Sequence, residues 1–310
     1  MRLLLTFLLL MASMSGSAWA DGLAIVLNSG DATLSVLDMA RETELRRVPV
    51  LREPHHVALS PDGSELLVGD AGANEMLFLD SRTGEIRRRM PVADPYQLAF
   101  SPDGKWLTVT GLARNQVDVY DASTMSLAKR FPLSSMPSHV AYAPDSSMAY
   151  VTLQGTNRLA AIDLRRQAVS WTAEVGATPA GVIWLNNKVL VANMGSDHFA
   201  VVDPVDGRVE QRIRTGRGAH QLFLSPDRKT LWVNNRVDGT TVALDAQTYA
   251  VIRSYRVPGG PDCIDFAPDG KLWITQRFIQ KVGVLDPATG TLQSISVGRS
   301  PHGIFLTGAR

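Results

Sequence analysis

Residues 95–133, PYQLAFSPDGKWLTVTGLARNQVDVYDASTMSLAKRFPL, contain the pattern that decides the fold. Four short segments with strand-like composition, at 96–101, 106–110, 116–120 and 126–133, are separated by polar turns. The first turn, Ser101-Pro102-Asp103-Gly104, combines a proline that fixes φ with a glycine that accepts positive φ, as a tight hairpin turn requires. This stretch predicts one four-stranded antiparallel sheet, whose segments we name A, B, C and D.

The same pattern recurs along the chain every 40 to 42 residues. The A segments begin at Pro54, Pro95, Pro137, Pro179, Ala219, Pro261 and Pro301. An aspartate that ends segment C keeps the same phase, at Asp38, Asp80, Asp121, Asp163, Asp203, Asp245 and Asp286. Four strands in a repeat of about 40 residues are typical of a β-propeller blade. The sequence therefore predicts an all-β, seven-bladed propeller of four-stranded antiparallel blades.

The order of the segments predicts how the ring closes. After residue 22 the chain begins with segments B, C and D, and the last A segment, 301–306, stands at the C-terminus without followers. The N- and C-terminal segments are therefore expected to pair in one blade, within a single domain over 21–310. The fourth unit departs most, because Leu185-Asn186-Asn187 replaces its Pro-Asp turn.

These units resemble the YVTN-type β-propeller repeat, of the periplasmic, YncE-like kind. Tyr150-Val151-Thr152 nearly spells the name of the repeat, and Asn115-x-Val117-x-Val119-x-Asp121 matches the pattern that follows it. The resemblance covers residues 22–306. It implies the seven-bladed fold and is far less specific for function.

Residues 1–20 are expected to be a signal peptide. Arg2 gives a positive start, residues 3–11 form an apolar core, and Ala18-Trp19-Ala20 is a small-x-small cleavage site. The apolar run is shorter than the roughly 20 residues of a membrane helix, and no later stretch approaches that length. The sequence predicts a periplasmic or secreted protein, cleaved near Ala20, with no membrane span.

Charge and cysteine content narrow the classes of partner and cofactor. The formal net charge is +1 and both signs are interleaved, so a nucleic-acid partner is not expected. Cys263 is the only cysteine, which excludes an internal disulfide and the two-cysteine attachment of haem. We expect a monomer whose partner is a small ligand or another periplasmic protein.

Histidines concentrate at the start of segment A. The second position of the seven units holds His55, Tyr96, Ser138, Ala180, His220, Asp262 and His302, and the third position adds His56, Gln97, His139 and Cys263. Since the A segments line the axis of a propeller, the second-position histidines and Asp262 are expected on one continuous arc. Strand alternation predicts that only one of the two columns faces the axis, and we expect it to be the second-position column.

Imidazoles that converge with a carboxylate suit a transition-metal ion such as Zn²⁺, Cu²⁺ or Fe²⁺. His55, His220, His302 and Asp262 are the candidate ligands, and a metal or haem is the candidate cofactor. The same groups also suit a carboxylate or sugar ligand, general acid–base chemistry, or a hydrated channel with no ligand.

Polar residues at the ends of the B segments and in the loops that follow them are expected around the mouth of the central channel, next to the starts of the A segments. Arg114, Arg236 and Arg277 could clamp an anionic group by bidentate hydrogen bonds. The candidate ligand-binding residues are these three arginines with Asn193, Asn235 and Tyr96.

The sequence contains no familiar catalytic motif, neither Gly-x-Ser-x-Gly, nor His-Glu-x-x-His, nor a phosphate-binding loop. The first hypothesis is therefore a non-enzymatic binding or scaffold propeller that presents its mouth to a ligand or partner. The alternatives are a metal- or haem-handling accessory of periplasmic redox metabolism and a lactonase-like hydrolase. The hydrolase would depend on carboxylates, for which Asp262 and Asp70 are the candidates.

Overall fold

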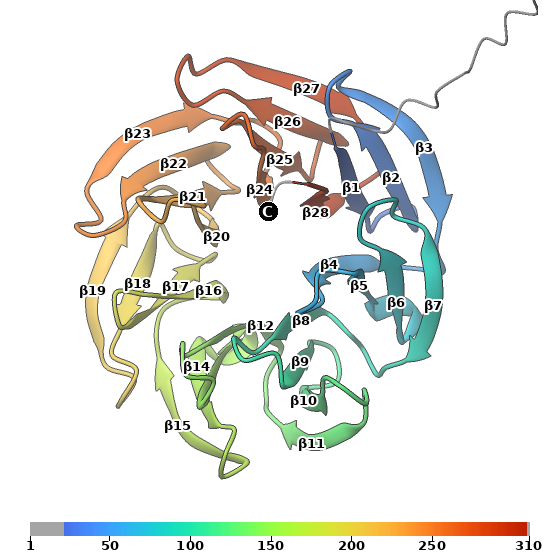
Figure 1. Ribbon diagram of the computed structural model, residues 1–310. Helices are drawn as coiled ribbons and strands as arrows, with labels where there is room; N and C mark the ends of the chain where they lie inside the picture. Colours follow the sequence, from blue (N-terminus) through green and yellow to red (C-terminus); the bar gives the residue numbers. More distant parts are fainter. Residues whose placement is uncertain (1–21, 309–310) are drawn as a thin grey trace, which may run out of the picture.

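Each repeat folds into one four-stranded antiparallel sheet, and seven such sheets surround a central axis (Figure 1). The computed structural model describes residues 22–308, so the expected signal peptide lies outside the described residues. We number the blades by their A strands, from blade 1 at Pro54 to blade 7 at Pro301. The predicted seven-bladed architecture is confirmed.

The four strands of a blade run outward from the axis in the order A, B, C, D. The A strands of blades 1 to 7 are β4 (Pro54–Leu59), β8 (Gln97–Phe100), β12 (Pro137–Tyr142), β16 (Pro179–Leu185), β20 (Ala219–Leu224), β24 (Pro261–Phe266) and β28 (Pro301–Leu306). The B strands are β5 (Glu65–Asp70), β9 (Trp106–Gly111), β13 (Met148–Leu153), β17 (Lys188–Asn193), β21 (Thr230–Asn235), β25 (Leu272–Gln276) and β1 (Leu23–Asn28).

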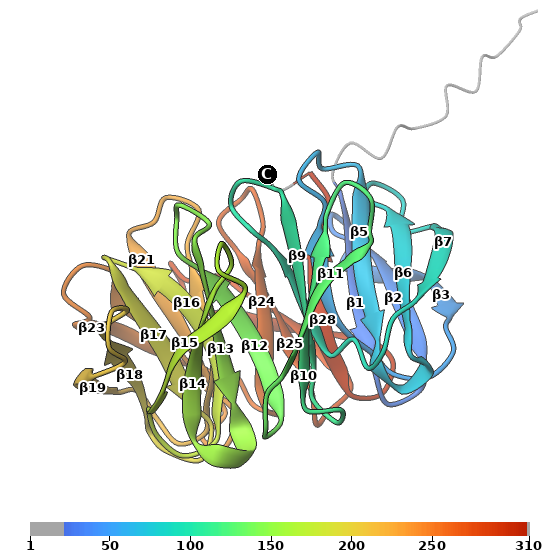
Figure 2. The same ribbon diagram turned by 90° about the horizontal axis from the view of Figure 1, so that it is seen from below.

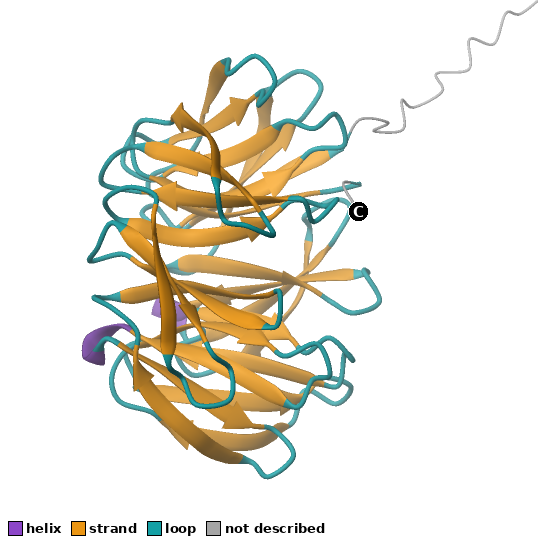
Figure 3. Ribbon diagram, turned by 90° about the vertical axis from the view of Figure 1, so that its left-hand side faces the viewer, coloured by secondary structure: helices purple, strands orange, loops and turns teal. Residues whose placement is uncertain are grey.

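The outer half of each blade follows the same order. The C strands are β6 (Glu75–Asp80), β10 (Gln116–Asp121), β14 (Arg158–Asp163), β18 (His198–Val202), β22 (Thr240–Asp245), β26 (Lys281–Leu285) and β2 (Thr33–Asp38). The D strands are β7 (Ile86–Pro91), β11 (Leu127–Pro132), β15 (Ala168–Glu174), β19 (Val209–Arg214), β23 (Val251–Arg256), β27 (Leu292–Ser296) and β3 (Thr43–Pro49). Two short 3-10 turns, η1 (Ala71–Ala73) and η2 (Gln154–Thr156), follow B strands and are the helical elements of the described chain (Figure 3).

The hydrophobic core lies between the blades rather than at the axis. Seven buried clusters each combine residues of two neighbouring sheets, one cluster for every interface of the ring. In the cluster between blades 6 and 7, for example, Trp273 packs with Val26 and Leu306. Stacking of sheet faces therefore holds the ring together and leaves the inner ends of the A strands free to carry polar residues.

The two ends of the chain share blade 7, as predicted. Strand β28 pairs antiparallel with β1, with Ala24 opposite Leu306 and Ile25 opposite Phe305. The sheet order β28-β1-β2-β3 closes the ring through backbone hydrogen bonds (Figure 2).

The divergent fourth unit still forms its A-to-B hairpin. Leu185 pairs with Lys188, and Asn186 and Asn187 between them have φ values of 51° and 57°. Positive φ at both central residues is the geometry of a two-residue type I′ turn, which asparagine tolerates better than most residues. The missing Pro-Asp pair is therefore replaced by another hairpin turn.

Among residues 22–308, no helix is long and apolar enough to cross a membrane.

Candidate functional site at the propeller axis

The second and third positions of the A strands meet at the axis, contrary to the expectation that only one column would face it. His56 contacts His139 and His302, with ring centroids 4.9 and 4.5 Å apart. The A strands shift register against their B strands here, for example between Pro54 and Val57 in blade 1. Such β-bulges interrupt the alternation of side chains, so neighbouring residues can both turn inward.

Seven side chains form what we call the axial cluster. They are His55, His56, Tyr96, His139, His220, Asp262 and His302. His55 stacks between His302 and Tyr96, with centroid separations of 3.8 and 4.1 Å. The five histidines and Asp262 are buried, with at most 5% of any of them exposed. The cluster is thus a contiguous polar core on the axis.

Hydroxyls of the B strands fix the backbone that carries these side chains. In blade 6 the Thr275 hydroxyl accepts the N–H of Cys263 at 2.9 Å and donates to the carbonyl of His302 in the next blade at 2.8 Å. Thr152 makes the equivalent bonds to His139 and Ala180. Each threonine satisfies an N–H that the bulge removes from the strand ladder and ties it to the neighbouring blade.

Asp262 is the charged centre of the cluster. Its Oδ2 accepts hydrogen bonds from Arg236 and, at 3.4 Å, from Arg277. Its Oδ1 lies 2.9 Å from His220 Nδ1, yet neither of these two atoms has a partner in hydrogen-bond geometry. Oδ2 also lies 3.5 Å from His302 Nε2. A carboxylate and two imidazoles therefore converge around a small volume.

The tautomer of His302 follows from its neighbours. Its Nδ1 lies 3.0 Å from the carbonyl oxygen of His55, which can only accept a hydrogen bond, so Nδ1 carries the proton. Nε2 then carries the lone pair, which accepts a 3.5 Å hydrogen bond from Arg236 Nη2 and lies 3.5 Å from Asp262 Oδ2. A histidine whose other nitrogen donates to a carbonyl is oriented as metal-binding histidines usually are.

Burial keeps the histidines of the cluster neutral near pH 7. Burial and then Arg236 lower the pKa of His220 to about 4. Burial also lowers the pKa values of His55, His56, His139 and His302 well below their ordinary value. Neutral imidazole is the form that binds metal ions.

The pKa values of the carboxyl group and of the phenol group in the cluster shift in opposite directions. Burial alone would raise the pKa of Asp262, but the neighbouring Arg236 guanidinium holds that pKa well below its usual range. Burial raises the pKa of Tyr96 to about 12. Asp262 is therefore an anion and Tyr96 a neutral phenol at physiological pH.

Several buried nitrogens of the cluster have no hydrogen-bond partner. They are His55 Nδ1, His56 Nε2, His139 Nε2 and His220 Nδ1. Buried polar atoms without partners are uncommon in folded proteins, and a bound ion is one way in which such atoms become satisfied. Two groups have donor atoms that all lie within 4.8 Å of one another: His220, Asp262 and His302, and His55, His56 and His302.

The candidate residues predicted from the sequence separate into two sets. His55, Tyr96, His220, Asp262 and His302 meet in the axial cluster, with Arg236 and Arg277 bonded to its carboxylate.

The residues of the second set bond to the loops around the axial cluster instead of to the cluster itself. Exposed Arg114 bonds to Asn74 on a neighbouring loop, and the amides of Asn193 and Asn235 donate to the backbone of the preceding D-to-A loops. Asp70 accepts the backbone N–H groups of Arg52, Glu53 and Ala73. No hydrogen bond or ion pair joins these four to the axial cluster within residues 22–308, and for Asp70 this removes support for a hydrolytic pair with Asp262.

Four residues at the site were not among those expected from the sequence. His56 and His139 belong to the cluster, and Cys263 Sγ lies 3.9 Å from His302 Nδ1 and 3.3 Å from Gln221 Oε1. Met194 Sδ lies 3.3 Å from Arg236 Nη1. The histidine-rich third column was the available signal for the first three, and no sequence feature singles out Met194.

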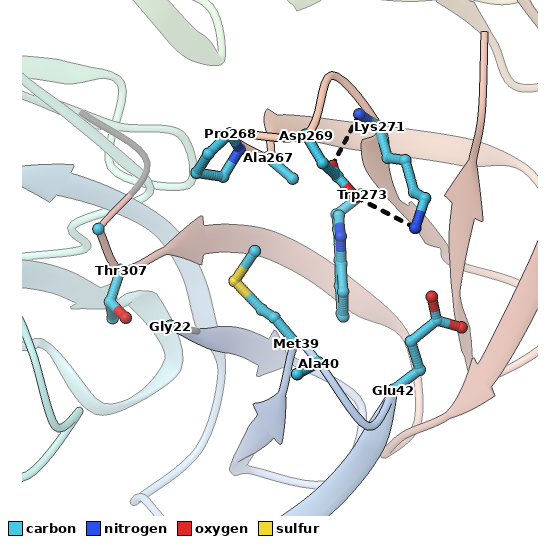
Figure 4. Close-up of a pocket in the computed structure, with 11 residues that line it drawn as sticks. Gly22, Met39, Ala40, Glu42, Ala267, Pro268, Asp269, Lys271, Trp273 and Thr307 are labelled. Carbon is cyan, nitrogen blue, oxygen red and sulfur yellow. Dashed lines mark hydrogen bonds and ion pairs between the residues drawn. The ribbon is translucent and has the colours of Figure 1, made fainter. Parts of the chain in front are cut away.

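A surface hollow of about 360 Å³ lies at the other end of the A strands, between the turns of blades 6 and 7 (Figure 4). Met39, Pro268 and Trp273 line it, and Lys271 pairs with Asp269 at 3.1 Å. It contains no residue of the axial cluster.

Fold and site together define a closed seven-bladed propeller with a histidine-rich polar core on its axis. The chain belongs to the YNCE-like beta-propeller family, whose model matches residues 7–309. No curated protein matches the chain.

Solved structures share the fold at low sequence identity. A functionally unknown protein from Desulfotomaculum acetoxidans is 12% identical, with a TM-score of 0.80 over 93% of this chain and 99% of that one. Dihydro-heme d1 dehydrogenase NirN in complex with DHE is 16% identical, with a TM-score of 0.69 over 92% and 75%. Virginiamycin B lyase from Staphylococcus aureus is 16% identical, with a TM-score of 0.69 over 82% and 91%. These likenesses show the fold alone.

Proposed function

We propose that this chain is an exported binding propeller whose ligand is a divalent transition-metal ion in the axial cluster. His220, Asp262 and His302 are the proposed donors, with His55 adjacent. The observation that carries the proposal is the pair His220 Nδ1 and Asp262 Oδ1, which are 2.9 Å apart, buried, and without partners in hydrogen-bond geometry. With the His220 proton on Nε2, both atoms carry lone pairs, and a cation that both can bind would satisfy them.

The spacing of the donors supports an ion of ordinary size. Metal–ligand bonds of about 2.1 Å place neighbouring ligand atoms roughly 3.0 to 3.4 Å apart in octahedral and tetrahedral sites. The Asp262 contacts to His220 and His302, at 2.9 and 3.5 Å, are close to this range. Imidazole and carboxylate together suit Zn²⁺, Cu²⁺ and Fe²⁺.

Close packing favours a single ion over a tetrapyrrole. The NirN structure was solved in complex with DHE, so a haem-type ligand merits comparison. In this chain, however, a macrocycle would have to separate histidine rings whose centroids lie 3.8 to 4.9 Å apart. The haem alternative therefore has less support here than the metal ion.

Elemental analysis tests the proposal directly. Protein purified without chelators from the periplasmic fraction should contain about one equivalent of a transition metal. His220→Ala and His302→Ala should each lose most of it. His198→Ala is the matched control, because His198 is the one histidine outside the axial cluster. Sub-stoichiometric metal that is unchanged in both cluster variants would refute the metal site and leave a scaffold role.

Export is a separate part of the proposal. The N-terminal residue of the mature protein should be Asp21, and the protein should appear in the osmotic-shock fraction. Retention of residues 1–20 on protein recovered from the cytoplasm would contradict export without affecting the metal test.

A further inference from the structure

Two arginines contact the buried carboxylate of the axial cluster from the loops above it. Arg236 and Arg277 are each the first residue after a B strand, in adjacent blades 5 and 6. Their side chains are 14% and 21% exposed, whereas that of Asp262 is fully buried. The guanidinium groups therefore lie between the cluster and solvent.

Neither guanidinium uses all its donors on the described chain. Each has five N–H groups. Arg236 Nε has no hydrogen-bond partner. Within residues 22–308, the Arg277 side chain makes one hydrogen bond, to Asp262 at 3.4 Å. Planar guanidinium groups with spare donors are well suited to carboxylates and other oxyanions.

The charge balance of the site also calls for an anion. One carboxylate and two guanidinium groups leave a net charge of +1 among the permanently charged side chains that meet at Asp262. A divalent ion would raise this to +3. Glu53 is the other acid whose charge reaches Arg277, but it is exposed and forms no ion pair with it in the described chain. Uncompensated charge in a buried site is costly.

We propose that Arg236 and Arg277 hold a small oxyanion, either a carboxylate or an inorganic anion, which binds the metal directly from the solvent side of the site. This inference rests on the proposed function and names the chemical class of the ligand that completes the site. The anion bonds to the metal on one side and to the two guanidinium groups on the other. No bond of the protein is made or broken in this step.

The test uses the full mature chain with acetate and sulfate as probes. Metal-free protein is loaded with Zn²⁺, its zinc content is measured, and each anion is titrated by calorimetry into loaded and metal-free samples. Zinc-loaded wild type should bind at least one of the anions tenfold or more tightly than metal-free protein does. A preference for acetate or for sulfate separates carboxylate from inorganic ligands.

Variants assign the effect to the arginines. Arg236→Met and Arg277→Met should each weaken anion binding by tenfold or more, compared with wild type at the same measured zinc content of one equivalent. Arg114→Met, at an exposed loop arginine outside the cluster, should leave anion binding unchanged.

Each failure has a distinct meaning. Zinc uptake with no detectable binding of either anion, or with binding that survives both arginine substitutions, overturns this inference alone. Absence of zinc uptake overturns the metal site and this inference together. If either variant unfolds, the same titration on Arg236→Lys and Arg277→Lys decides, because lysine keeps the charge but loses the paired donors.

Discussion

The Nδ1 atom of His302 donates a hydrogen bond to the carbonyl oxygen of His55, 3.0 Å away and 247 positions earlier in the chain. This bond crosses from blade 7 to blade 1, so it forms only when the ring is closed. It also fixes which nitrogen of His302 faces Asp262. Closure of the fold and orientation of a proposed metal ligand therefore depend on one contact.

Acid should destabilise the metal-free protein through its buried histidines. His220 has a folded pKa of about 4 and an ordinary value of 6.5, so below pH 6.5 the unfolded chain binds a proton that the folded chain does not. The contribution of His220 to the free energy of unfolding is therefore fully present above pH 6.5 and is lost as the pH drops toward 4. One such histidine contributes about 2 kcal/mol of loss between pH 7 and pH 5.

Thermal melts of metal-free protein across this pH range check the prediction. His220→Gln should flatten the decline in Tm, and His198→Gln should leave it unchanged. An equal decline in wild type and His220→Gln would show that His220 does not titrate as described.

Thr275 should matter to the site without touching a ligand atom. Thr275→Val removes the donor to the His302 carbonyl and the acceptor of the Cys263 N–H. We expect a loss of about 1–3 kcal/mol in the free energy of unfolding and of about tenfold in zinc affinity. Thr275→Ser should restore both, and exposed Thr43→Val serves as control. If Thr275→Ser lowers the zinc affinity as much as Thr275→Val does, the hydroxyl of Thr275 does not position the site.

Asp262 and Arg236 should be energetically coupled. Asp262→Asn leaves the guanidinium without its carboxylate, which should cost about 2–4 kcal/mol of stability. In the double variant with Arg236→Met, that penalty should shrink, because the guanidinium closest to Asp262 is gone and only the longer contact of Arg277 is still lost. Denaturant unfolding of the four proteins gives the coupling energy, and simple additivity of the two single effects would argue against the ion pair.

The turn of blade 4 should tolerate glycine but not a β-branched residue. Asn187 has a φ of 57°, so Asn187→Val should lower the free energy of unfolding by about 1–2 kcal/mol. Asn187→Gly should cost far less, because glycine adopts positive φ without strain. Equal losses for the two variants, measured by chemical denaturation, would exclude backbone conformation as the cause.

The last strand should contribute as much stability as an interior one. Leu306 is fully buried between blades 6 and 7, so Leu306→Ala should cost about 2–5 kcal/mol. Leu45→Ala, at a leucine that is 41% exposed on a D strand, should cost much less. Similar midpoints of unfolding for both variants would mean that β28 is dispensable for the folded ring.

The repeat made the fold predictable from the sequence, whereas the orientation of side chains at the axis was not. The spacing of Pro54, Pro261 and Pro301 identified the blades and brought His55, Asp262 and His302 together. Strand alternation then led to the wrong expectation for His56 and the rest of the third column. Bulges at the starts of the A strands break the alternation, and nothing in the local sequence marked them.

The distance of each loop arginine from the end of its B strand decides whether it reaches the site. Arg236 and Arg277 directly follow the last residue of a B strand, while Arg114 comes three residues after Gly111, at the tip of its loop. Only the first two contact Asp262. Their position relative to the strand end, rather than their presence in the loop, separates them from Arg114.

The pairing of β28 with β1 gives ligand binding a mechanical consequence. An ion held by His220 and His302 would link the C-terminal strand β28 of blade 7 to blade 5. It would therefore cross-link the two blades next to the place where β28 and β1 close the ring. Separation of β28 from β1 would then require release of the ion. Metal binding should therefore slow the opening of the ring as well as shift the folding equilibrium toward the closed propeller.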